Sequence, residues 1–367
     1  MDAQRLKQNF AQVAQHGDGV ALFFYSDLFL RHPEVREYFP VSMALQRDRL
    51  LGALGRIISQ VDRLEEIAPF IQQLGRDHRK FGIIAEHFPA VGQSLVATLR
   101  YFSGPDWTPE LEADWTAAYQ LLAQVMIDAA EADAGKHPPW WVATVIEHER
   151  RTFDVAAFRV TTDRPLEYMP GQSVSVECGL RPKLWRYYSM ANAPRRDGTI
   201  DFHVRIVDGG PVSPVMVRTL AVGERLRLGP PVGQMTLNTQ SPRDILLVAG
   251  STGLAPLKAI LEHVTLQAAP PKVHLFFGAR TQDGLYDLPD LQKLADSYPW
   301  FTLVTAVSDD DGYQGEHGLL PDVLARYGQW DRHDAYICGS PAMVEATTRR
   351  LVQTGMPPEQ IRTDEYG

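Results

Sequence analysis

The stretch Ile245-Leu246-Leu247-Val248-Ala249-Gly250-Ser251-Thr252-Gly253-Leu254-Ala255-Pro256-Leu257 sets the fold class of the C-terminal third of this sequence. Its apolar start predicts a buried strand, the glycine turn ends that strand, and a helix-like segment follows. Another buried strand, Val273-His274-Leu275-Phe276-Phe277, comes next. This order of strand, turn, helix and strand predicts a βαβ unit of a parallel sheet.

Gly250, Thr252 and Gly253 occupy the turn of this unit. Such a turn can bind the diphosphate of a dinucleotide, because glycines let the diphosphate approach the backbone and the helix N-terminus offers N–H groups. An ordinary strand–helix turn is the alternative. We expect a dinucleotide-binding loop here.

The stretch Arg186-Tyr187-Tyr188-Ser189-Met190 lies upstream, after a strand-like segment at residues 171–178. A flavin site needs a guanidinium for the diphosphate, a phenol for the ribityl chain and a small hydroxyl facing the redox-active ring nitrogen. Arg186, Tyr188 and Ser189 supply these groups. Because the motif is short, an exposed edge strand carrying an arginine and tyrosines is the alternative reading.

Three kinds of sequence pattern follow one another along the chain. Only six of the 26 prolines precede His137, and apolar residues at helical spacing predict that this part is all-helical. The helical pattern breaks at residues 134–139, and short alternating segments from Trp141 onward predict the strands of a barrel. We expect three domains, at residues 1–135, 138–238 and 240–367.

Composition limits the classes of partner. A chain of 367 residues exceeds what one hydrophobic core serves, and 44% hydrophobic with 22% charged residues indicates a globular protein. The net charge of -9 argues against nucleic acid and against an anionic membrane surface. The expected partners are therefore small molecules, and no obligate protein partner is indicated.

The sequence also bears on location. It has no apolar run near the ~18 residues of a membrane span and no export signal at its N-terminus. Cys178 and Cys338 form neither a metal pattern nor a disulfide framework, which suits a reducing compartment. We expect a cytoplasmic protein.

His78 lies in a helix-like segment, where a lone histidine is more often structural than a ligand. Its surroundings, however, resemble the globin of the flavohaemoglobin family, at His78 itself and at residues 24–29, 32–40, 46–54 and 91–99. The resemblance implies a multidomain protein. An all-α globin comes first, then an antiparallel β-barrel FAD domain, then an α/β parallel-sheet nicotinamide-binding domain.

The globin resemblance implies haem b, with His78 as the proximal ligand of the iron and Phe39 packed on the porphyrin face. It makes Tyr25 and Gln46 a distal hydrogen-bonding pair and Leu50 the apolar wall beside the ligand. A phenol and an amide can hold oxygen that carries partial negative charge, while an imidazole anchors the iron. Helix packing is the alternative role of Tyr25, Phe39 and Leu50.

The proximal side departs from better-known flavohaemoglobins. In those proteins a tyrosine after the proximal helix and a glutamate in the last globin helix hydrogen-bond the proximal histidine. This sequence has Phe88 and Ala130 at the two places, and Asp77 precedes His78 where a lysine is usual. We therefore expect weaker electron donation to the iron.

The sequence from Trp141 to Gly367 resembles the ferredoxin-NADP⁺ reductase superfamily, which carries hydride from a nicotinamide to FAD. The resemblance assigns FAD or the nicotinamide to Arg186, Tyr188, Ser189, Gly210, Val212, Ser213, Gly250, Thr252, Gly253, Cys338 and Gly339. The glycine pair before Val212 taken alone would be a hairpin turn. The terminal Glu365 and Tyr366 resemble a tail that covers the flavin or lies near it, and an unstructured terminus is the alternative.

Together the resemblances imply an oxidoreductase that passes electrons from NAD(P)H through FAD to haem b and converts nitric oxide and O2 to nitrate. Two alternatives stay open: an NADH-dependent reductase of haem or of a small acceptor, which Phe88 and Ala130 favour, and a gas-binding redox sensor. NADH should be preferred over NADPH. Arg280 is accompanied by Asp283 and Asp287, and these acids should repel a 2′-phosphate.

Overall fold

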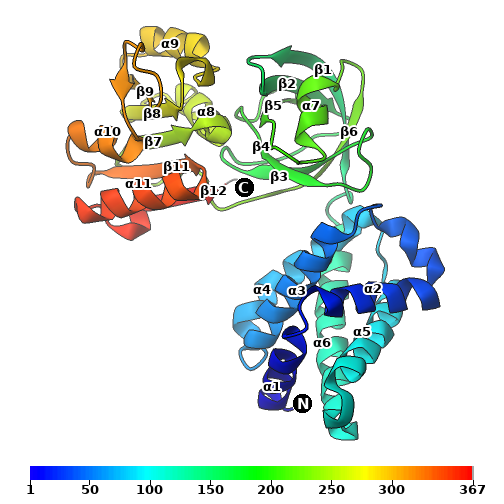
Figure 1. The fold of residues 1–367 in the computed structure, drawn as a ribbon. Helices are drawn as coiled ribbons and strands as arrows, with labels where there is room; N and C mark the ends of the chain where they lie inside the picture. Colours follow the sequence, from blue (N-terminus) through cyan, green and yellow to red (C-terminus); the bar gives the residue numbers. More distant parts are fainter. Residues whose placement is uncertain (366–367) are drawn as a thin grey trace. The chain divides into compact units, whose positions relative to one another are not determined.

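The computed structural model describes residues 1–365 of the chain. The chain forms two compact units, Met1–Trp140 and Trp141–Gly367, and each is considered by itself (Figure 1). Within residues 1–365, no helix combines the length and the apolar character needed to cross a membrane.

The first unit is all-helical, as the sequence predicts. Its main helices are α1 (Ala3–Ala14), α2 (Asp18–Arg31), α3 (Ala44–Ser59), α4 (Leu64–His78), α5 (Phe88–Ser103) and α6 (Pro109–Ala134), with a short 3-10 helix η1 (Pro33–Tyr38). Their apolar faces meet in a core that contains Leu28, Leu99 and Trp115. The α4 and α6 helices approach closely at Gly75, where a Cβ atom would lie 2.2 Å from the carbonyl oxygen of Met126. Glycine at this position therefore fixes the distance between the helix that ends in His78 and the last helix of the unit.

The second unit begins with a six-stranded antiparallel sheet. Its strands are β1 (Trp141–Arg150), β2 (Val155–Thr162), β3 (Ser173–Cys178), β4 (Arg186–Ser189), β5 (Thr199–Arg205) and β6 (Arg225–Val232), in the order β4-β3-β6-β1-β2-β5. A bridge between Met190 and Phe202 joins the two outer strands, so the sheet closes into a barrel. The short helix α7 (Ser213–Arg218) packs against the barrel core with Met216 and Val217 fully buried.

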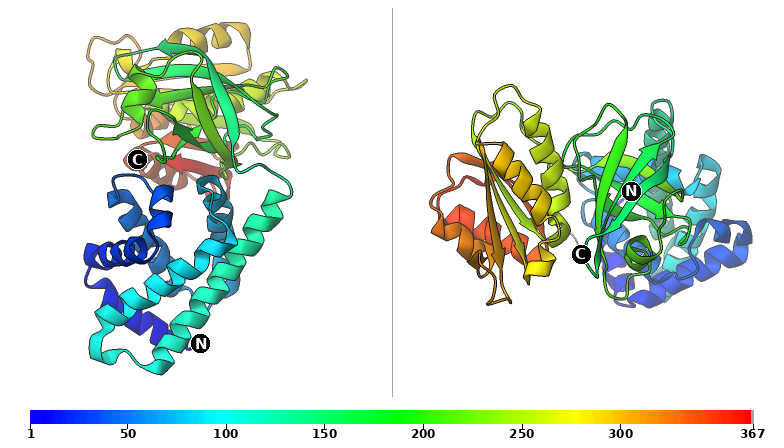
Figure 2. Two further views of the ribbon diagram at one scale, coloured as in Figure 1. Left: turned by 90° about the vertical axis from the view of Figure 1, so that its right-hand side faces the viewer. Right: turned by 90° about the horizontal axis from the view of Figure 1, so that it is seen from above.

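A six-stranded parallel sheet follows. Its strands are β7 (Asp244–Gly250), β8 (Val273–Ala279), β9 (Phe301–Val307), β10 (Glu316–His317), β11 (His333–Gly339) and β12 (Ile361–Glu365), in the order β10-β9-β8-β7-β11-β12. Helices α8 (Leu254–Thr265) and α9 (Leu288–Ser297) cover one face, and α10 (Leu320–Arg326) and α11 (Pro341–Gln353) cover the other (Figure 2). Because both faces are buried, the central strands are mostly apolar. The predicted fold class is confirmed.

Candidate functional site

His78 is the last residue of α4, and its ring is half-buried. Its Nδ1 lies 2.7 Å from the carbonyl oxygen of Leu74, one helical turn earlier. A peptide oxygen can only accept, so Nδ1 carries the proton and Nε2 keeps its lone pair. Burial also lowers the pKa of His78, which keeps the imidazole neutral. This tautomer and charge fit an iron ligand.

The residues predicted for the haem pocket beside the gas ligand lie on α2, directly after η1, and on α3. The hydroxyl of Tyr25 donates to the backbone carbonyl of Gln46 at 3.3 Å, and the Tyr25 ring meets the edge of the Phe39 ring at 5.5 Å. Phe39 and Leu50 pack against the same apolar core. Burial raises the pKa of Tyr25, so its phenol stays protonated as a donor. The contact uses the backbone of Gln46, so the structure brings the phenol, and not the side-chain amide, into these apolar surroundings. A buried phenol beside Phe39 and Leu50 fits a pocket for a haem and its gaseous ligand.

Phe88 and Ala130 stand where better-known flavohaemoglobins have a tyrosine and a glutamate, and the structure shows what surrounds these two positions. Phe88 packs in the apolar cluster between α4 and α6, and its carbonyl oxygen accepts from the Tyr119 hydroxyl at 2.6 Å. One turn after Ala130, Asp133 pairs with Arg79, the residue next to His78. Nothing in the sequence indicated this pair, because the two residues lie on different helices. Thus a carboxylate of α6 binds Arg79, the neighbour of the predicted proximal ligand, while His78 itself donates to Leu74.

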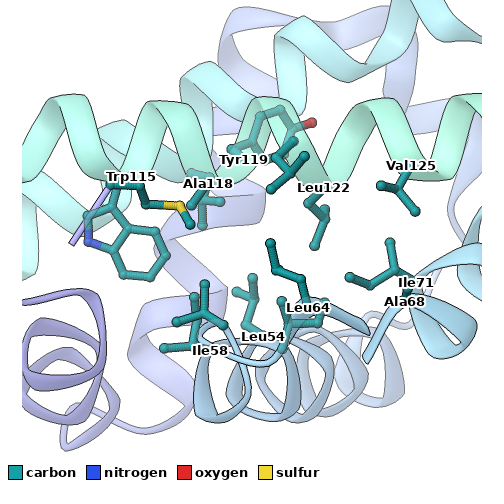
Figure 3. Close-up of a pocket in the computed structure, with 15 residues that line it drawn as sticks. Leu54, Ile58, Leu64, Ala68, Ile71, Trp115, Ala118, Tyr119, Leu122 and Val125 are labelled. Atoms are coloured by element: carbon teal, nitrogen blue, oxygen red, sulfur yellow. The ribbon is translucent and has the colours of Figure 1, made fainter. Parts of the chain in front are cut away.

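An apolar cavity of about 140 Å³ lies inside the first unit, between α3, α4, α5 and α6 (Figure 3). Leu54, Ile58, Ala118 and Leu122 are among its lining residues. None of Tyr25, Phe39, Gln46, Leu50 and His78 is among its lining residues.

The flavin stretch forms β4, an outer strand of the barrel sheet that pairs with β3. Arg186 and Tyr188 project to one side because strand residues alternate. Tyr188 packs against the barrel core, and burial raises its pKa to about 12. Arg186 lies close enough to oppose that rise. Ser189 stands opposite Ser173 on β3. A guanidinium and a phenol on one side of an accessible strand fit the diphosphate and ribityl chain of FAD.

The glycine turn before α7 keeps its shape through Ser213. The Ser213 Oγ accepts from the backbone N–H of Val207 at 2.9 Å, and Gly210 N–H donates to the Val207 carbonyl at 2.9 Å. Val212 is buried in the barrel core. Val212 therefore serves the barrel core and Ser213 Oγ supports the turn, while their backbone N–H groups and the Ser213 hydroxyl proton could meet a diphosphate.

Three glycines form a cradle at the carboxyl ends of the adjacent strands β7 and β11. A Cβ atom on Gly253 would lie 2.2 Å from the Cys338 carbonyl oxygen, and one on Gly339 would lie 2.2 Å from the Met343 methyl carbon. Gly250 lies against Gly339, with its added Cβ 3.7 Å from the Gly339 Cα. Strand order reverses here, since β8 lies on one side of β7 and β11 on the other. Open α/β sheets bind nucleotides in this crevice, so the cradle fits a dinucleotide.

Cys338 lies within the sheet below this cradle and is 3% exposed. Burial raises the pKa of its thiol, so the group stays protonated and acts by packing. Thr252 is half-buried in the loop that opens α8. Glu365 ends β12, where its backbone stands beside Gly339. The prediction for Tyr366 falls outside the described residues.

One of the two acids predicted to act beside Arg280 is engaged elsewhere. Asp287 is fully buried and binds Lys258 at 2.5 Å, so its proposed repulsion of a 2′-phosphate is wrong. Instead, Asp309 binds the exposed Arg280 at 2.8 Å, and Asp310 accepts from the Gln282 N–H at 3.2 Å. Sequence alone could not show that the loop after β9 meets the loop after β8.

Comparisons with known proteins cover the whole chain. Residues 22–126 match the globin family, residues 142–237 the oxidoreductase FAD-binding domain, and residues 247–349 the oxidoreductase NAD-binding domain. The flavohemoprotein of Bacillus subtilis (strain 168) is 25% identical over 389 aligned residues, covering 99% of this chain and 96% of the relative.

One further relative matches the reductase part, and one solved structure matches the whole chain. The ferredoxin–NAD(P)(+) reductase component of the naphthalene 1,2-dioxygenase system of Pseudomonas putida is 33% identical, over 67% of this chain and 75% of its own length. A solved flavohemoglobin from Malassezia yamatoensis shares the fold with a TM-score of 0.79 and 16% identity, covering 100% of this chain and 98% of that one. The chain therefore belongs to the flavohaemoglobin family of oxidoreductases, whose electron-carrying groups are NAD(P)H, FAD and haem.

Proposed function

We propose that this protein is a nitric oxide dioxygenase that draws its electrons from NADH. The observation that carries the proposal is the placement of Tyr25 against Gln46, beside Phe39 and Leu50, in a chain that also holds its own reductase. One nitric oxide, one O2 and one electron balance to one nitrate. NADH supplies an electron pair as hydride, which accounts for a flavin between the nicotinamide and a one-electron centre.

When bound, the nicotinamide would supply hydride, FAD would store the electrons, and haem would supply the one-electron chemistry of the gases. The protein's part is to hold and shield the reactants. The Tyr25 hydroxyl makes only a long bond to Gln46, so it can turn its proton to a substrate oxygen at little cost. Leu50, packed on the same apolar core, would help to exclude water there. His78 presents the Nε2 lone pair because Leu74 accepts its Nδ1 proton.

In the reductase, Arg186 would offset the charge of the FAD diphosphate, and Tyr188 and Ser189 would meet the ribityl chain and the ring. Gly250, Thr252 and Gly253 would admit the nicotinamide dinucleotide. We propose domain limits at residues 1–135, 138–238 and 240–367. The partners would be O2, nitric oxide and NADH, with no nucleic acid. The two buried, unpaired cysteines, Cys178 and Cys338, favour a cytoplasmic location.

The test is NADH oxidation by the aerobic, haem- and FAD-loaded protein, followed with and without nitric oxide, together with nitrate formation. The dioxygenase should consume nitric oxide and yield nitrate in proportion to NADH. Tyr25→Phe should slow nitric oxide consumption about a hundredfold, the order expected when a donor to a developing charge is removed. The same variant should keep its haem and its reduction of ferricyanide by NADH. Nitric oxide that leaves NADH oxidation unchanged would exclude the proposal.

A second candidate is an NADH-dependent reductase of haem or of a small acceptor. It is favoured by the neutral peptide oxygen of Leu74 as the acceptor from His78, where a carboxylate would strengthen electron donation. The reductase part is also more similar in sequence to the Pseudomonas putida reductase component than the whole chain is to the flavohemoprotein. Fast NADH oxidation with an added acceptor, unaffected by nitric oxide, would favour this candidate.

A further inference from the structure

The strand β5 of the barrel contacts the nucleotide-binding half of the second unit through alternate residues. The hydroxyl of Tyr286 lies 2.8 Å from Nδ1 of His203, and Nη1 of Arg205 donates to Oγ of Ser251 at 3.1 Å. Alternation places Asp201, His203 and Arg205 on one side of β5. One polar strand face therefore connects the barrel to the loop after β7.

Ser251 has an unusual backbone. Its φ is +50°, and only one other non-glycine residue among residues 1–365, Lys183, has a positive φ. A side chain crowds the backbone in this left-handed region, so a serine needs external support to stay there. Ser251 stands between Gly250 and Thr252, in the loop that the dinucleotide would meet.

Arg205 is itself fixed at both edges of its guanidinium. Its Nε donates to Asp154 Oδ2 at 2.7 Å, while Nη1 reaches Ser251. Two residues later along the chain, the Val207 N–H donates to Oγ of Ser213, the first residue of α7. A single strand end thus contacts the nucleotide loop and leads directly into the turn predicted for the FAD diphosphate.

We propose that Arg205 is a positioning residue for the nicotinamide dinucleotide. It holds Ser251 in the left-handed conformation and so keeps the N–H groups of residues 250–253 directed at the incoming diphosphate. Its side chain acts on the loop, and the contact with the dinucleotide is left to the backbone. The inference rests on the nucleotide site of the proposed function.

The experiment measures NAD⁺ binding by calorimetry, and the KM for NADH with ferricyanide as acceptor, on the full-length, FAD-loaded protein. Arg205→Ala should raise Kd and KM roughly tenfold, the effect of releasing one strained residue, while kcat changes little. Arg205→Lys should restore part of the affinity. Arg225→Ala, which removes an exposed arginine from β6, is the matched control and should alter neither constant.

Two substitutions of Ser251 separate the possible modes of action. Ser251→Ala loses the hydrogen bond but keeps the Cβ, so it should weaken binding as much as Arg205→Ala. Ser251→Gly accepts a positive φ without support, so it should weaken binding less. In the Ser251→Gly background, Arg205→Ala should have little further effect on KM.

An equal loss from Arg205→Ala in both backgrounds would show that Arg205 touches the dinucleotide directly and would overturn the proposal. Unchanged NADH affinity in the single variant would do so too. If the wild-type protein reduces ferricyanide with NADH and Arg205→Ala leaves its NADH affinity unchanged, the proposal for Arg205 fails while the proposed nucleotide site stands. A wild-type protein that binds no NAD⁺ would instead remove the site itself.

Discussion

Nδ1 of His203 lies 2.8 Å from the hydroxyl oxygen of Tyr286, and both side chains are buried. His203 belongs to the barrel strand β5, and Tyr286 follows β8 of the parallel sheet. Burial, helped by the nearby charge of Lys258, holds the pKa of His203 well below its usual 6.5. This contact between the two halves of the reductase therefore contains a neutral histidine.

The first prediction is that acid destabilises the second unit. Below about pH 6.5 the unfolded chain binds a proton at His203 that the folded chain does not bind. The free energy of unfolding therefore decreases as the pH is lowered. Above that pH the contribution is fully present. Burial lowers the pKa of His274 and His333 as well, and they act in the same direction. Urea unfolding, followed by flavin fluorescence between about pH 5 and pH 8, measures the slope.

His203→Gln removes the titrating group and should flatten part of this slope. The control is His263→Gln. His263 lies on α8, and among the described residues it makes no hydrogen bond or ring contact with His203. If the two variants retain the same slope as the wild type, the buried histidine does not control the acid response.

The second prediction concerns haem retention. His78→Ala should lose stoichiometric haem and its Soret band, because Nε2 of His78 keeps the lone pair that would bind the iron. His16→Ala, at an exposed histidine, should keep both. Absorption spectra of the purified variants decide the matter, and a normal Soret band in His78→Ala would exclude His78 as the ligand.

The third prediction is a weak iron–histidine bond. Since Leu74 offers a neutral peptide oxygen, His78 should lack the imidazolate character that a carboxylate acceptor produces. Resonance Raman of the ferrous protein should show an iron–histidine stretch below that of relatives with the tyrosine and glutamate. Phe88→Tyr combined with Ala130→Glu should raise it. A high stretch in the wild type would mean that another acceptor reaches Nδ1.

The parts of the site that could be predicted from sequence are those set by local order. Gly250 and Gly253 follow a buried strand and precede a helix, so their place at a sheet end follows from chain order alone. Arg186 and Tyr188 share a strand face for the same reason. His78 ends its helix, and its tautomer depends on Leu74, only one turn away.

Contacts between distant segments could not be predicted in this way. Arg79 with Asp133, Arg205 with Ser251, and Arg280 with Asp309 each depend on the register of two elements that pack together. Asp287 shows that closeness in sequence does not ensure contact in the fold. Its carboxylate stands near Arg280 in the sequence, yet it is fully buried at the start of α9 and binds Lys258 on α8.

The fourth prediction concerns cofactor choice. Arg280 is bound by Asp309, so a 2′-phosphate would have to displace a carboxylate, and NADH should be preferred. Asp309→Asn should raise kcat/KM for NADPH relative to NADH about tenfold, the order of one close charge pair. Asp311→Asn, an exposed neighbour, should leave the ratio unchanged. A wild type that uses NADPH more efficiently would contradict the reading of this loop.

The fifth prediction uses the apolar cavity of the first unit, where Ala118 on α6 faces free space (Figure 3). Ala118→Leu should extend into that space, so the free energy of unfolding should change by less than about 1 kcal/mol or rise. Ala123, on the same helix, is buried and does not line the cavity. Ala123→Leu should therefore cost about 1–3 kcal/mol through overpacking. Urea unfolding followed by the Soret band compares the two variants in the haem-loaded protein. Equal losses would mean that the cavity closes around Ala118 in solution, whereas a smaller loss at Ala118 shows that the space is open.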